Sequence, residues 1–319
     1  MKKSKSLFKT SAAALAVLHI INKLVDLSAL SDLNKKTNGK FYHWKHGDIF
    51  YTVSDKDSNS LKKPLLLIHD LTVFSSNHEW NQIIEDLSKE YVVYALDLVG
   101  CGKSEKPEIT YTNYYYVQLI QDFIKDIIKE PTKVITSGFS LSMVLMADSI
   151  DKNLFTDITA INPKTINFYK KTPDERSKII MNLFHLPIIG KTVYYMKTCR
   201  QNVEYYLTED CFYNPFNLKK STSDAYYNAA HSSMGKGRML LASLDGSYLN
   251  IDITNALKNT EKEITIILGE YNKEKDEVES SYLKYKPEIK IKLISKAKLL
   301  PQLETPEELL SSFFDLNII

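Results

Sequence analysis

The sequence predicts a doubly wound, mostly parallel α/β sheet with a helical insertion and an N-terminal helix. Short apolar runs alternate with segments of helical period over residues 40–162. The alternation stops between residues 163 and 253, where helical patterns follow one another, and strand-like runs resume at 264–268 and 289–293. Such alternation is typical of parallel strands joined by helical crossovers. The middle segment is therefore predicted to be an insertion over a sheet that is completed afterwards.

Residues 1–35 predict one amphipathic helix. Lys2, Lys3, Lys5 and Lys9 precede an apolar run over 12–21, and further apolar residues follow up to Leu30. This run is short of the ~20 residues needed to span a bilayer. A signal peptide is the alternative, although no small-x-small cleavage site follows. We expect residues 1–30 to pack on the body or to lie on a membrane surface. The protein is expected to be cytoplasmic, with secretion not excluded.

Composition argues against several classes of partner. The chain has 319 residues, and 41 basic residues nearly balance 39 acidic ones for a net charge of +2. Without a basic stripe beyond the N-terminus, nucleic-acid binding has no electrostatic support. The three cysteines, Cys101, Cys199 and Cys211, suit a reducing compartment better than a disulfide framework. No His/Cys cluster has metal spacing, so neither a metal nor a cofactor is expected.

The first half of the predicted core contains a strand pair over 41–53, a buried strand over 64–68 and a strand over 91–97. Ser76 and Glu79 have capping-box spacing and are predicted to open the helix between the last two strands. The loop Gly100–Ser104 resembles the end of a phosphate-binding loop. That motif would need glycine where Asp97 stands, so nucleotide binding is not expected.

The segment 133–147 predicts a strand, a sharp turn and a helix. A β-branched run comes first and apolar residues at helical spacing come last. Between them, small residues Gly138 and Ser142 stand two positions on either side of Ser140. A tight strand-to-helix turn needs such small residues, because the two backbones nearly collide. We expect the Ser140 hydroxyl to be exposed at the apex, near a helix N-terminus.

With these elements in order, residues 40 to 316 resemble an α/β-hydrolase. The resemblance rests on His69-Asp70 at a strand end, the Ala95–Ser104 segment, the turn at Ser140, and the Leu300–Glu307 segment. It implies a core over 40–162 and 254–319 and a helical cap over 163–253. Aromatic residues crowd the cap, and they either line an apolar ligand pocket or pack its own core, the latter being favoured for most of them.

The resemblance implies a Ser, acid and His triad in that order. Ser140 takes the nucleophile position. Asn272 stands where the acid is expected, and Leu299 stands where the histidine is expected. The implied oxyanion donors are the backbone N–H groups of Leu71 and Leu141. Asp70 replaces the usual glycine of the oxyanion loop, and its charge would oppose a developing oxyanion.

Two functions remain open from the sequence. In the first, the chain is a serine hydrolase acting on an ester or acyl bond of an apolar small molecule, with a relocated base. His231 and His185 are the histidines after the turn, and Glu270, Glu274 or Asp276 would supply the acid. In the second, it is a non-catalytic relative that binds a small molecule. Substitutions at three separate catalytic positions argue against ordinary triad catalysis.

Overall fold

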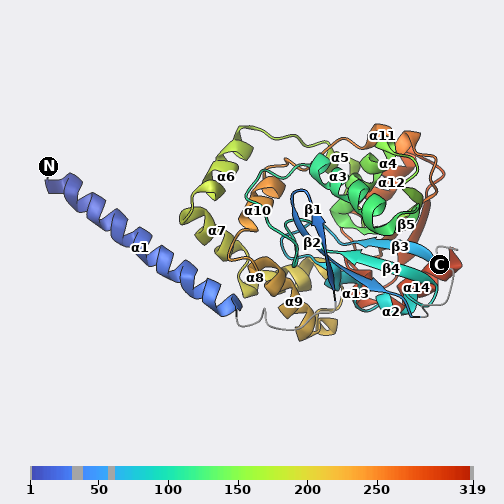
Figure 1. Cartoon of the computed structure of the whole chain (residues 1–319), viewed down its shortest axis with the longest axis horizontal. Helices are drawn as coiled ribbons and strands as arrows, with labels where there is room; N and C mark the ends of the chain where they lie inside the picture. The colour runs from blue at the N-terminus through green and yellow to red at the C-terminus, as the bar shows by residue number, and fades with distance from the viewer. Residues whose placement is uncertain (1, 31–38, 57–61, 317–319) are drawn as a thin grey trace.

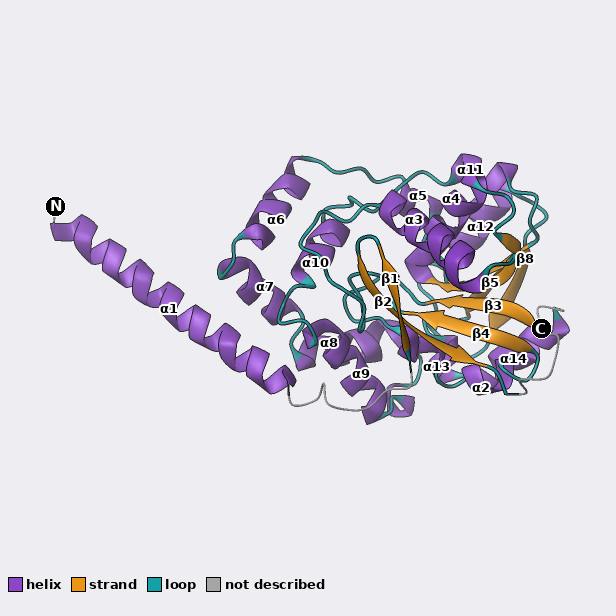
Figure 2. Cartoon of the chain, viewed as in Figure 1, coloured by secondary structure: helices purple, strands orange, loops and turns teal. Residues whose placement is uncertain are grey.

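The computed structural model describes residues 2–30, 39–56 and 62–316. Its eight-stranded sheet has the order β1-β2-β4-β3-β5-β6-β7-β8, with β1, β2 and β4 paired antiparallel and the remaining pairs parallel (Figure 2). This confirms the predicted doubly wound, mostly parallel sheet. The strands are β1 (Lys40–Trp44), β2 (Gly47–Ser54), β3 (Lys63–Ile68), β4 (Tyr91–Leu96), β5 (Thr132–Ser137), β6 (Phe155–Ile161), β7 (Ile264–Gly269) and β8 (Lys290–Ile294).

Helices cover both faces of the sheet. Along β3, Leu66 and Ile68 pack into one apolar core while Leu65 and Leu67 pack into another, because successive strand residues point to opposite faces. The helices and helical turns of the sheet layers are η1 (Asn77–Trp80), α2 (Ile84–Leu87), α3 (Asn113–Phe123), η2 (Ile124–Ile128), η3 (Gly138–Ser140), α4 (Leu141–Ile150), α11 (Thr254–Asn259), α12 (Lys275–Tyr285), α13 (Pro301–Glu304) and α14 (Pro306–Asp315). Both faces are therefore buried, as the continuous apolar runs of the strands require.

The segment between β6 and β7 is helical. It contains α5 (Ile166–Tyr169), α6 (Glu175–His185), α7 (Ile189–Lys197), α8 (Arg200–Tyr205), η4 (Tyr206–Cys211), η5 (Pro215–Asn217), α9 (Lys220–His231) and α10 (Arg238–Asp245). Its aromatic residues Tyr194, Phe212 and Tyr226 are fully buried. They pack the interior of this cap rather than line an open surface.

Helix α1 (Lys2–Leu30) runs along the cap and projects from the body (Figure 1). The predicted end of the N-terminal segment, residue 35, lies outside the described residues. Asn22 and Asp26 are buried against α7. The single long helix agrees with the sequence pattern. No helix in the described part of the chain is long and apolar enough to cross a membrane.

Glu304 ties the cap to the sheet layer. This carboxylate, at the end of α13, accepts hydrogen bonds from the backbone N–H groups of Tyr213 (2.9 Å) and Asn214 (2.7 Å) in the cap, and Lys298 lies 3.4 Å away. It is 8 % exposed, so these N–H groups take the place of water as its hydrogen-bond donors. These hydrogen bonds therefore fix the cap segment at residues 213–214 to the end of α13.

We predict that Glu304→Ala lowers the free energy of unfolding by about 1–3 kcal/mol, because it leaves two part-buried cap amides without their acceptor. Urea denaturation measures this change. Glu209→Ala is the matched control, since Glu209 is exposed in the cap and should change stability by less than about 0.5 kcal/mol. Equal losses in the two variants would contradict the assigned role of Glu304.

Candidate functional site

The sharp turn after β5 is made at Gly138. Its φ of +55° lies in the left-handed region that favours glycine, whereas Ser140 has an ordinary helical φ of −66°. The residues Gly138–Ser140 form one 3₁₀ turn and α4 begins at Leu141. The apex of the strand-to-helix turn therefore lies two residues earlier than the sequence pattern suggested.

Ser140 is not at the apex, and the prediction of an exposed hydroxyl is wrong. Its side chain is fully buried, and its Oγ donates a hydrogen bond to the carbonyl oxygen of His69 over 2.6 Å. The early turn places residue 140 at the base of α4, from where the side chain points toward the end of β3. The N–H of Leu141 is directed at the carbonyl of Phe139 within the same turn. Ser140 thus fastens β3 to the turn.

The carboxylate of Asp70 lies at the apex. Its Oδ1 accepts hydrogen bonds from the N–H of Leu71 over 2.8 Å and from the N–H of Phe139 over 2.7 Å. Leu71 is one of the predicted oxyanion donors, and Phe139 takes the place predicted for Leu141 because the apex is at Gly138. A Cβ atom on Gly138 would lie only 2.1 Å from the same Oδ1. The cradle that would stabilise an oxyanion holds the protein's own carboxylate.

A second buried carboxyl group lies behind Asp70. Glu79 is fully buried, with its Oε2 accepting from the N–H of Asp70 over 3.1 Å and its Oε1 from the hydroxyl of Tyr226 over 3.3 Å. Burial, together with the charge of Asp70, raises the pKa of Glu79 to about 8. The predicted capping box is wrong, because Glu79 turns inward to Asp70 instead of back to Ser76.

His69 supports the loop. Its Nδ1 donates to the carbonyl of Asp70 over 2.6 Å, and its Nε2 accepts from the N–H of Leu98 over 3.0 Å. Both nitrogens are occupied in one tautomer of the neutral ring, and burial lowers the pKa of this imidazole. His69 therefore positions the Asp70 loop without a free nitrogen for proton transfer.

Asn272 and Leu299, at the positions expected for the acid and the histidine, both form a hydrogen bond with the side chain of Asn162, which follows β6. The Asn162 Oδ1 accepts from the side-chain amide of Asn272 over 2.9 Å and from the N–H of Gly269 over 3.0 Å. Its Nδ2 donates to the carbonyls of Lys298 and Leu299. Position 272 thus supplies a hydrogen-bond donor, which an ionised carboxylate cannot do.

Leu299 lies in the loop between β8 and α13 and packs against apolar residues of the cap. Its backbone N–H donates to the carbonyl of Cys211 over 3.1 Å. Its side chain packs with a cluster made of Val203, Leu207, Cys211, Phe212, Tyr226, Leu300 and Leu303. Nearby, the ring of Phe74, in the loop after Asp70, lies tilted against the ring of Tyr206 in the cap, with ring centroids 5.7 Å apart. Side chains fill the region where a catalytic imidazole would stand.

The relocated bases and acids are not brought to the turn by any contact among the described residues. The Nδ1 of His231 donates to the carbonyl of Tyr227 over 2.8 Å, and its ring stacks between tyrosines inside the cap. Burial lowers the pKa of this imidazole. His185 is exposed at the end of α6. Glu270 and Glu274 are exposed beyond β7, and Asp276 lies in the first turn of α12.

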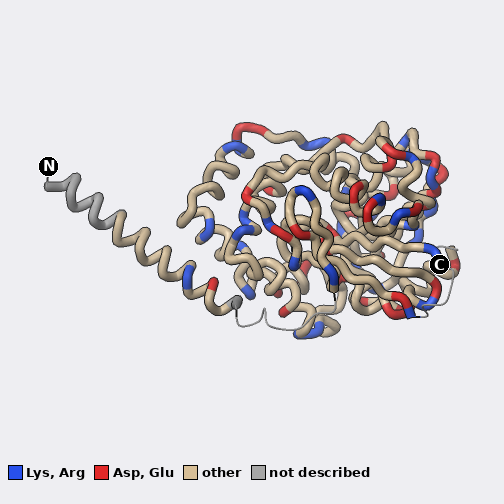
Figure 3. The backbone as a smooth tube through the Cα atoms, viewed as in Figure 1, with Lys and Arg blue, Asp and Glu red and all other residues tan. Residues whose placement is uncertain are grey.

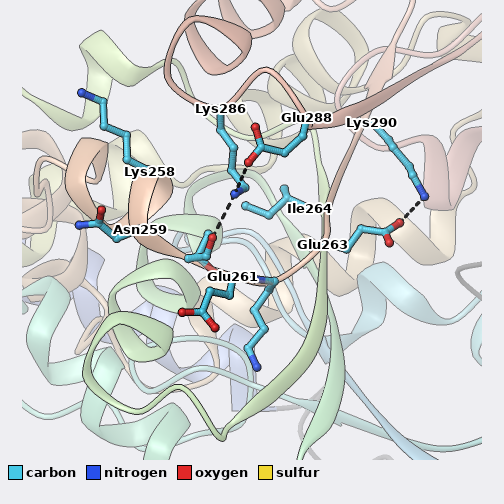
Figure 4. Close-up of a pocket in the computed structure, with 10 residues that line it drawn as sticks. Lys258, Asn259, Glu261, Glu263, Ile264, Lys286, Glu288 and Lys290 are labelled. Atoms are coloured by element: carbon cyan, nitrogen blue, oxygen red, sulfur yellow. Dashed lines mark hydrogen bonds and ion pairs between the residues drawn. The ribbon is translucent and has the colours of Figure 1, made fainter.

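A surface depression of about 610 Å³ lies at the ends of the strands opposite the turn, and Figure 4 shows its lining residues. Its lining includes Lys286 and Lys290, near the amino ends of β7 and β8, whereas Gly138 follows the carboxyl end of β5. Lys286 donates to Glu288 and to the carbonyl of Thr260, and Lys290 pairs with Glu263. The depression is lined mainly by charged and polar side chains, two pairs of which form ion pairs, and it lies at the other ends of the strands from the turn.

The sequence pattern did not indicate the roles of Gly138, Phe139 and Glu79 around the apex of the turn. One signal was available in Thr136-Ser-Gly-Phe-Ser140, which has the same small-residue spacing as 138–142 but centres on a glycine. A glycine is the residue best able to adopt the strained backbone of the apex. The local sequence does not show whether Glu79 caps a helix or turns into the interior. Its orientation depends on the N–H of Asp70, a donor in the loop after β3.

Comparisons with known proteins agree on the fold. No protein-family model matches the chain. A 64-residue stretch is 38% identical to 2-hydroxy-6-oxo-6-(2'-aminophenyl)hexa-2,4-dienoic acid hydrolase of Metapseudomonas resinovorans, covering 20% of this chain and 22% of that protein. The chain thus matches about a fifth of the length of this curated relative.

Solved structures are similar over most of the chain. Cfl2 from Burkholderia cenocepacia has a TM-score of 0.71 at 12% identity, covering 87% of this chain and 95% of that one. BphD, 2-hydroxy-6-oxo-6-phenylhexa-2,4-dienoate hydrolase from Rhodococcus sp. strain RHA1, has a TM-score of 0.68 at 13% identity, covering 88% and 98%. An alpha/beta hydrolase fold protein from Burkholderia ambifaria has a TM-score of 0.67 at 17% identity, again covering 88% and 98%. At these identities the likeness shows the fold alone.

We predict that Gly138→Ala lowers the free energy of unfolding by about 2–5 kcal/mol, because the new Cβ meets the Asp70 carboxyl group and the backbone is left-handed. In the Asp70→Gly background the same change should cost only about 1–2 kcal/mol, since the backbone strain remains and the collision is gone. A double-mutant cycle by chemical denaturation measures the coupling. Additive effects would mean that the two residues do not collide.

A second prediction concerns pH. An unfolded chain releases the Glu79 proton near pH 4.5, while the folded protein retains it up to about pH 8. The free energy of unfolding should therefore fall as pH rises between these values, by at most about 1.4 kcal/mol per pH unit from this group. Glu79→Gln should remove this contribution when urea midpoints are compared between pH 5 and 8. An unchanged slope in the variant would contradict the raised pKa.

Proposed function

We propose that this chain, which has the α/β-hydrolase fold, is a non-catalytic relative of serine hydrolases. One observation carries the proposal: the Asp70 carboxylate is bound by the Leu71 and Phe139 amides beside an apex that has no side chain, Gly138. In this proposal position 138, rather than position 140, corresponds to the nucleophile. The place where an ester carbonyl would be attacked is already occupied.

Acyl-transfer catalysis by a serine needs a nucleophile, a base, an acid that orients the base, and free oxyanion donors. Gly138 supplies no nucleophile, Leu299 no base and Asn272 no carboxylate. The donors bind a carboxylate that belongs to the chain. Losing the base of such a triad alone costs on the order of 10⁶ in kcat. Four independent requirements are therefore unmet at one site.

The serine hydrolase interpretation of Ser140 receives no support from the local geometry. Its hydroxyl donates to the His69 carbonyl, and His231, a histidine of the cap, donates to the carbonyl of Tyr227. The hydrolase names of the structural neighbours support descent from an enzyme lineage. They do not supply a nucleophile to this chain.

The small-molecule partner expected from the sequence, an apolar compound or an ester, also remains a proposal. In a hydrolase it would bind between the cap and the oxyanion loop. Among the described residues, Tyr206, Leu299 and Leu300 fill that region together with the rest of the apolar cluster. A ligand there would have to displace the cap, so binding without hydrolysis would be coupled to cap movement.

We also propose that α1 brings the protein to a membrane surface. The support is an exposed apolar stripe on this helix together with the lysines at its start. This role needs no chemistry from the hydrolase site. It therefore fits a chain that keeps the fold while its catalytic positions change.

A fluorophosphonate probe tests the absence of catalysis. We predict that the folded parent shows no labelling at Ser140 or elsewhere in the site and no hydrolysis of short p-nitrophenyl esters above background. Ser140→Ala should leave both results unchanged. A combined variant, Asp70→Gly, Gly138→Ser, Asn272→Asp and Leu299→His, should become labelled at position 138, as peptide mass spectrometry can show.

Labelling of the parent at Ser140, or ester turnover that Ser140→Ala abolishes, would overturn the proposal. Turnover that depends on Asp70 instead, tested with Asp70→Asn, would also overturn it and would identify a carboxylate nucleophile. These two arms use the parent and single variants, so the conclusion does not depend on whether the combined variant folds.

A further inference from the structure

Two buried carboxyl groups lie next to each other beneath the cap. Glu79 is fully buried, Asp70 is 6 % exposed, and the Glu79 Oε2 accepts a hydrogen bond from the N–H of Asp70 over 3.1 Å. Their hydrogen-bond donors among the described residues are uncharged: backbone N–H groups for Asp70, and a backbone N–H group and hydroxyls for Glu79. Two adjacent buried carboxylates without a cation are strongly unfavourable. One of the two groups is therefore expected to keep its proton.

The hydrogen bonds decide which group carries the charge. The Asp70 Oδ1 accepts from two backbone N–H groups, over 2.7 Å and 2.8 Å, which stabilises the ionised form. Glu79 has longer contacts, 3.1 Å from the Asp70 nitrogen and 3.3 Å from the Tyr226 hydroxyl. The geometry thus favours a charged Asp70 and a protonated Glu79. Burial, followed by the charge of Asp70, raises the pKa of Glu79 to about 8, in agreement with this assignment.

The titratable side chains around Glu79 are mainly acids. They come from the elements packed against η1 and are His69 and Asp70 after β3, Asp97, Cys101 and Lys106 after β4, Tyr206 and Cys211 of η4, Tyr226 of α9, Glu304 of α13, and His78 of η1 itself. Burial lowers the pKa of both histidines, so their rings are neutral at pH 7. The Lys106 Nζ donates to the carbonyl of Gly102. Ionisation of Glu79 therefore adds a second buried negative charge that these side chains do not neutralise.

This acid-rich region is a local feature. The whole chain has a net charge of +2, and Figure 3 shows basic and acidic positions interspersed over the body of the molecule. The region lies where the cap meets the sheet layer, so the charge of Glu79 bears on the contact between the two.

The cap covers Glu79 through few contacts. The hydroxyl of Tyr226, on α9, bonds to the Glu79 Oε1, and the Tyr226 ring packs in an apolar cluster with Cys211 of η4 and with Leu300. On the other side, Glu79 bonds to the loop after β3, a strand that pairs with both β4 and β5. Movement on that side would break strand pairing, whereas lifting α9 and η4 separates mainly apolar side chains. Water therefore reaches Glu79 most readily from the cap side.

We propose that the proton on Glu79 holds the cap closed. With Glu79 protonated, α9 and η4 stay seated on the sheet layer. Ionisation of Glu79 beside Asp70 favours a state in which these two elements lift and water reaches the acid pair. The inference goes beyond the loss of catalysis, because it concerns the conditions under which the buried cradle at Leu71 and Phe139 becomes accessible.

The pH range follows from linkage. Glu79 releases its proton near 4.5 when the cap is open and near pH 8 when it is closed. The open population should therefore rise about tenfold per pH unit between about pH 5 and 8, and level off above this range.

Native-state hydrogen exchange of the full chain, corrected for the intrinsic exchange rate at each pH, measures this opening. Amides of α9 and η4 should lose protection about tenfold per pH unit between pH 5 and 8. At each pH they should exchange about a hundredfold faster than those of β5, and without the urea dependence of global unfolding.

Cys211 offers a second measurement. It is buried in η4, whereas Cys199 is partly exposed in the closed protein. Labelling of Cys211 by iodoacetamide, relative to that of Cys199 in the same molecule, should rise with the same pH dependence.

Glu79→Gln keeps the shape of the protonated acid but does not ionise. In this variant the protection of α9 and η4 should change by less than about twofold between pH 5 and 8. Glu85→Gln is the matched control, since Glu85 is exposed on α2, and it should keep the pH dependence of the parent.

Two outcomes would overturn the proposal. If α9, η4 and β5 share one protection factor and one urea dependence, Glu79 acts on the whole fold and the cap does not open separately. If the protection of α9 and η4 in the parent is independent of pH, the proton on Glu79 does not hold the cap. Both outcomes are read from the parent, so the test does not depend on whether Glu79→Gln folds.

Discussion

The structure around the turn depends on one carboxylate oxygen that receives two backbone N–H groups. Asp70 Oδ1 binds the amides of Leu71 and Phe139, and each of the three groups is buried. A buried carboxylate without donors and buried amides without an acceptor would each be unfavourable. Their combination satisfies all of them and joins the loop after β3 to the turn after β5. The carboxylate and the two N–H groups thus form a structural joint between β3 and β5.

The groups around this joint are neutral or apolar, so they do not compete with the charge of Asp70. Glu79 approaches Asp70 from behind, and its burial favours the neutral acid, so the pair avoids two adjacent negative charges. The ends of β6 and β7 are joined by the side-chain amides of Asn162 and Asn272. Leu299 then packs against the cap. Neutral amides and hydrocarbon occupy the two positions at which the resemblance to hydrolases implies an acid and a histidine, and their contacts join the cap to the sheet layer.

The order of strands and helices could be predicted from the sequence, because buried strands and amphipathic helices have different hydrophobic periods. The apex of the turn could not. The spacing of small residues fits both 136–140 and 138–142, and only the backbone angle of Gly138 distinguishes them. The assignment of Asn272 and Leu299 to the acid and histidine positions follows from the resemblance to α/β-hydrolases. Their shared partner Asn162 required the fold, since β6 and β7 are separated by the whole cap.

The N-terminal helix illustrates a different limit. Its pattern predicts an amphipathic helix but does not say which side faces the body. Hydrophobic burial alone would place Leu24 and Leu27 inward. Asn22 and Asp26 face the body instead, because Lys191 in the cap supplies the positive charge that pairs with Asp26. Patterns within one helix cannot include such partners.

The near-collision at Gly138 couples two positions that are far apart in the sequence. Any side chain at position 138 would place its Cβ 2.1 Å from the Asp70 oxygen. A serine at position 138 and the present rotamer of Asp70 therefore exclude each other. A change at position 138 alone is sterically blocked while the carboxylate stays in place, so a side chain could enter the apex only together with a change at position 70.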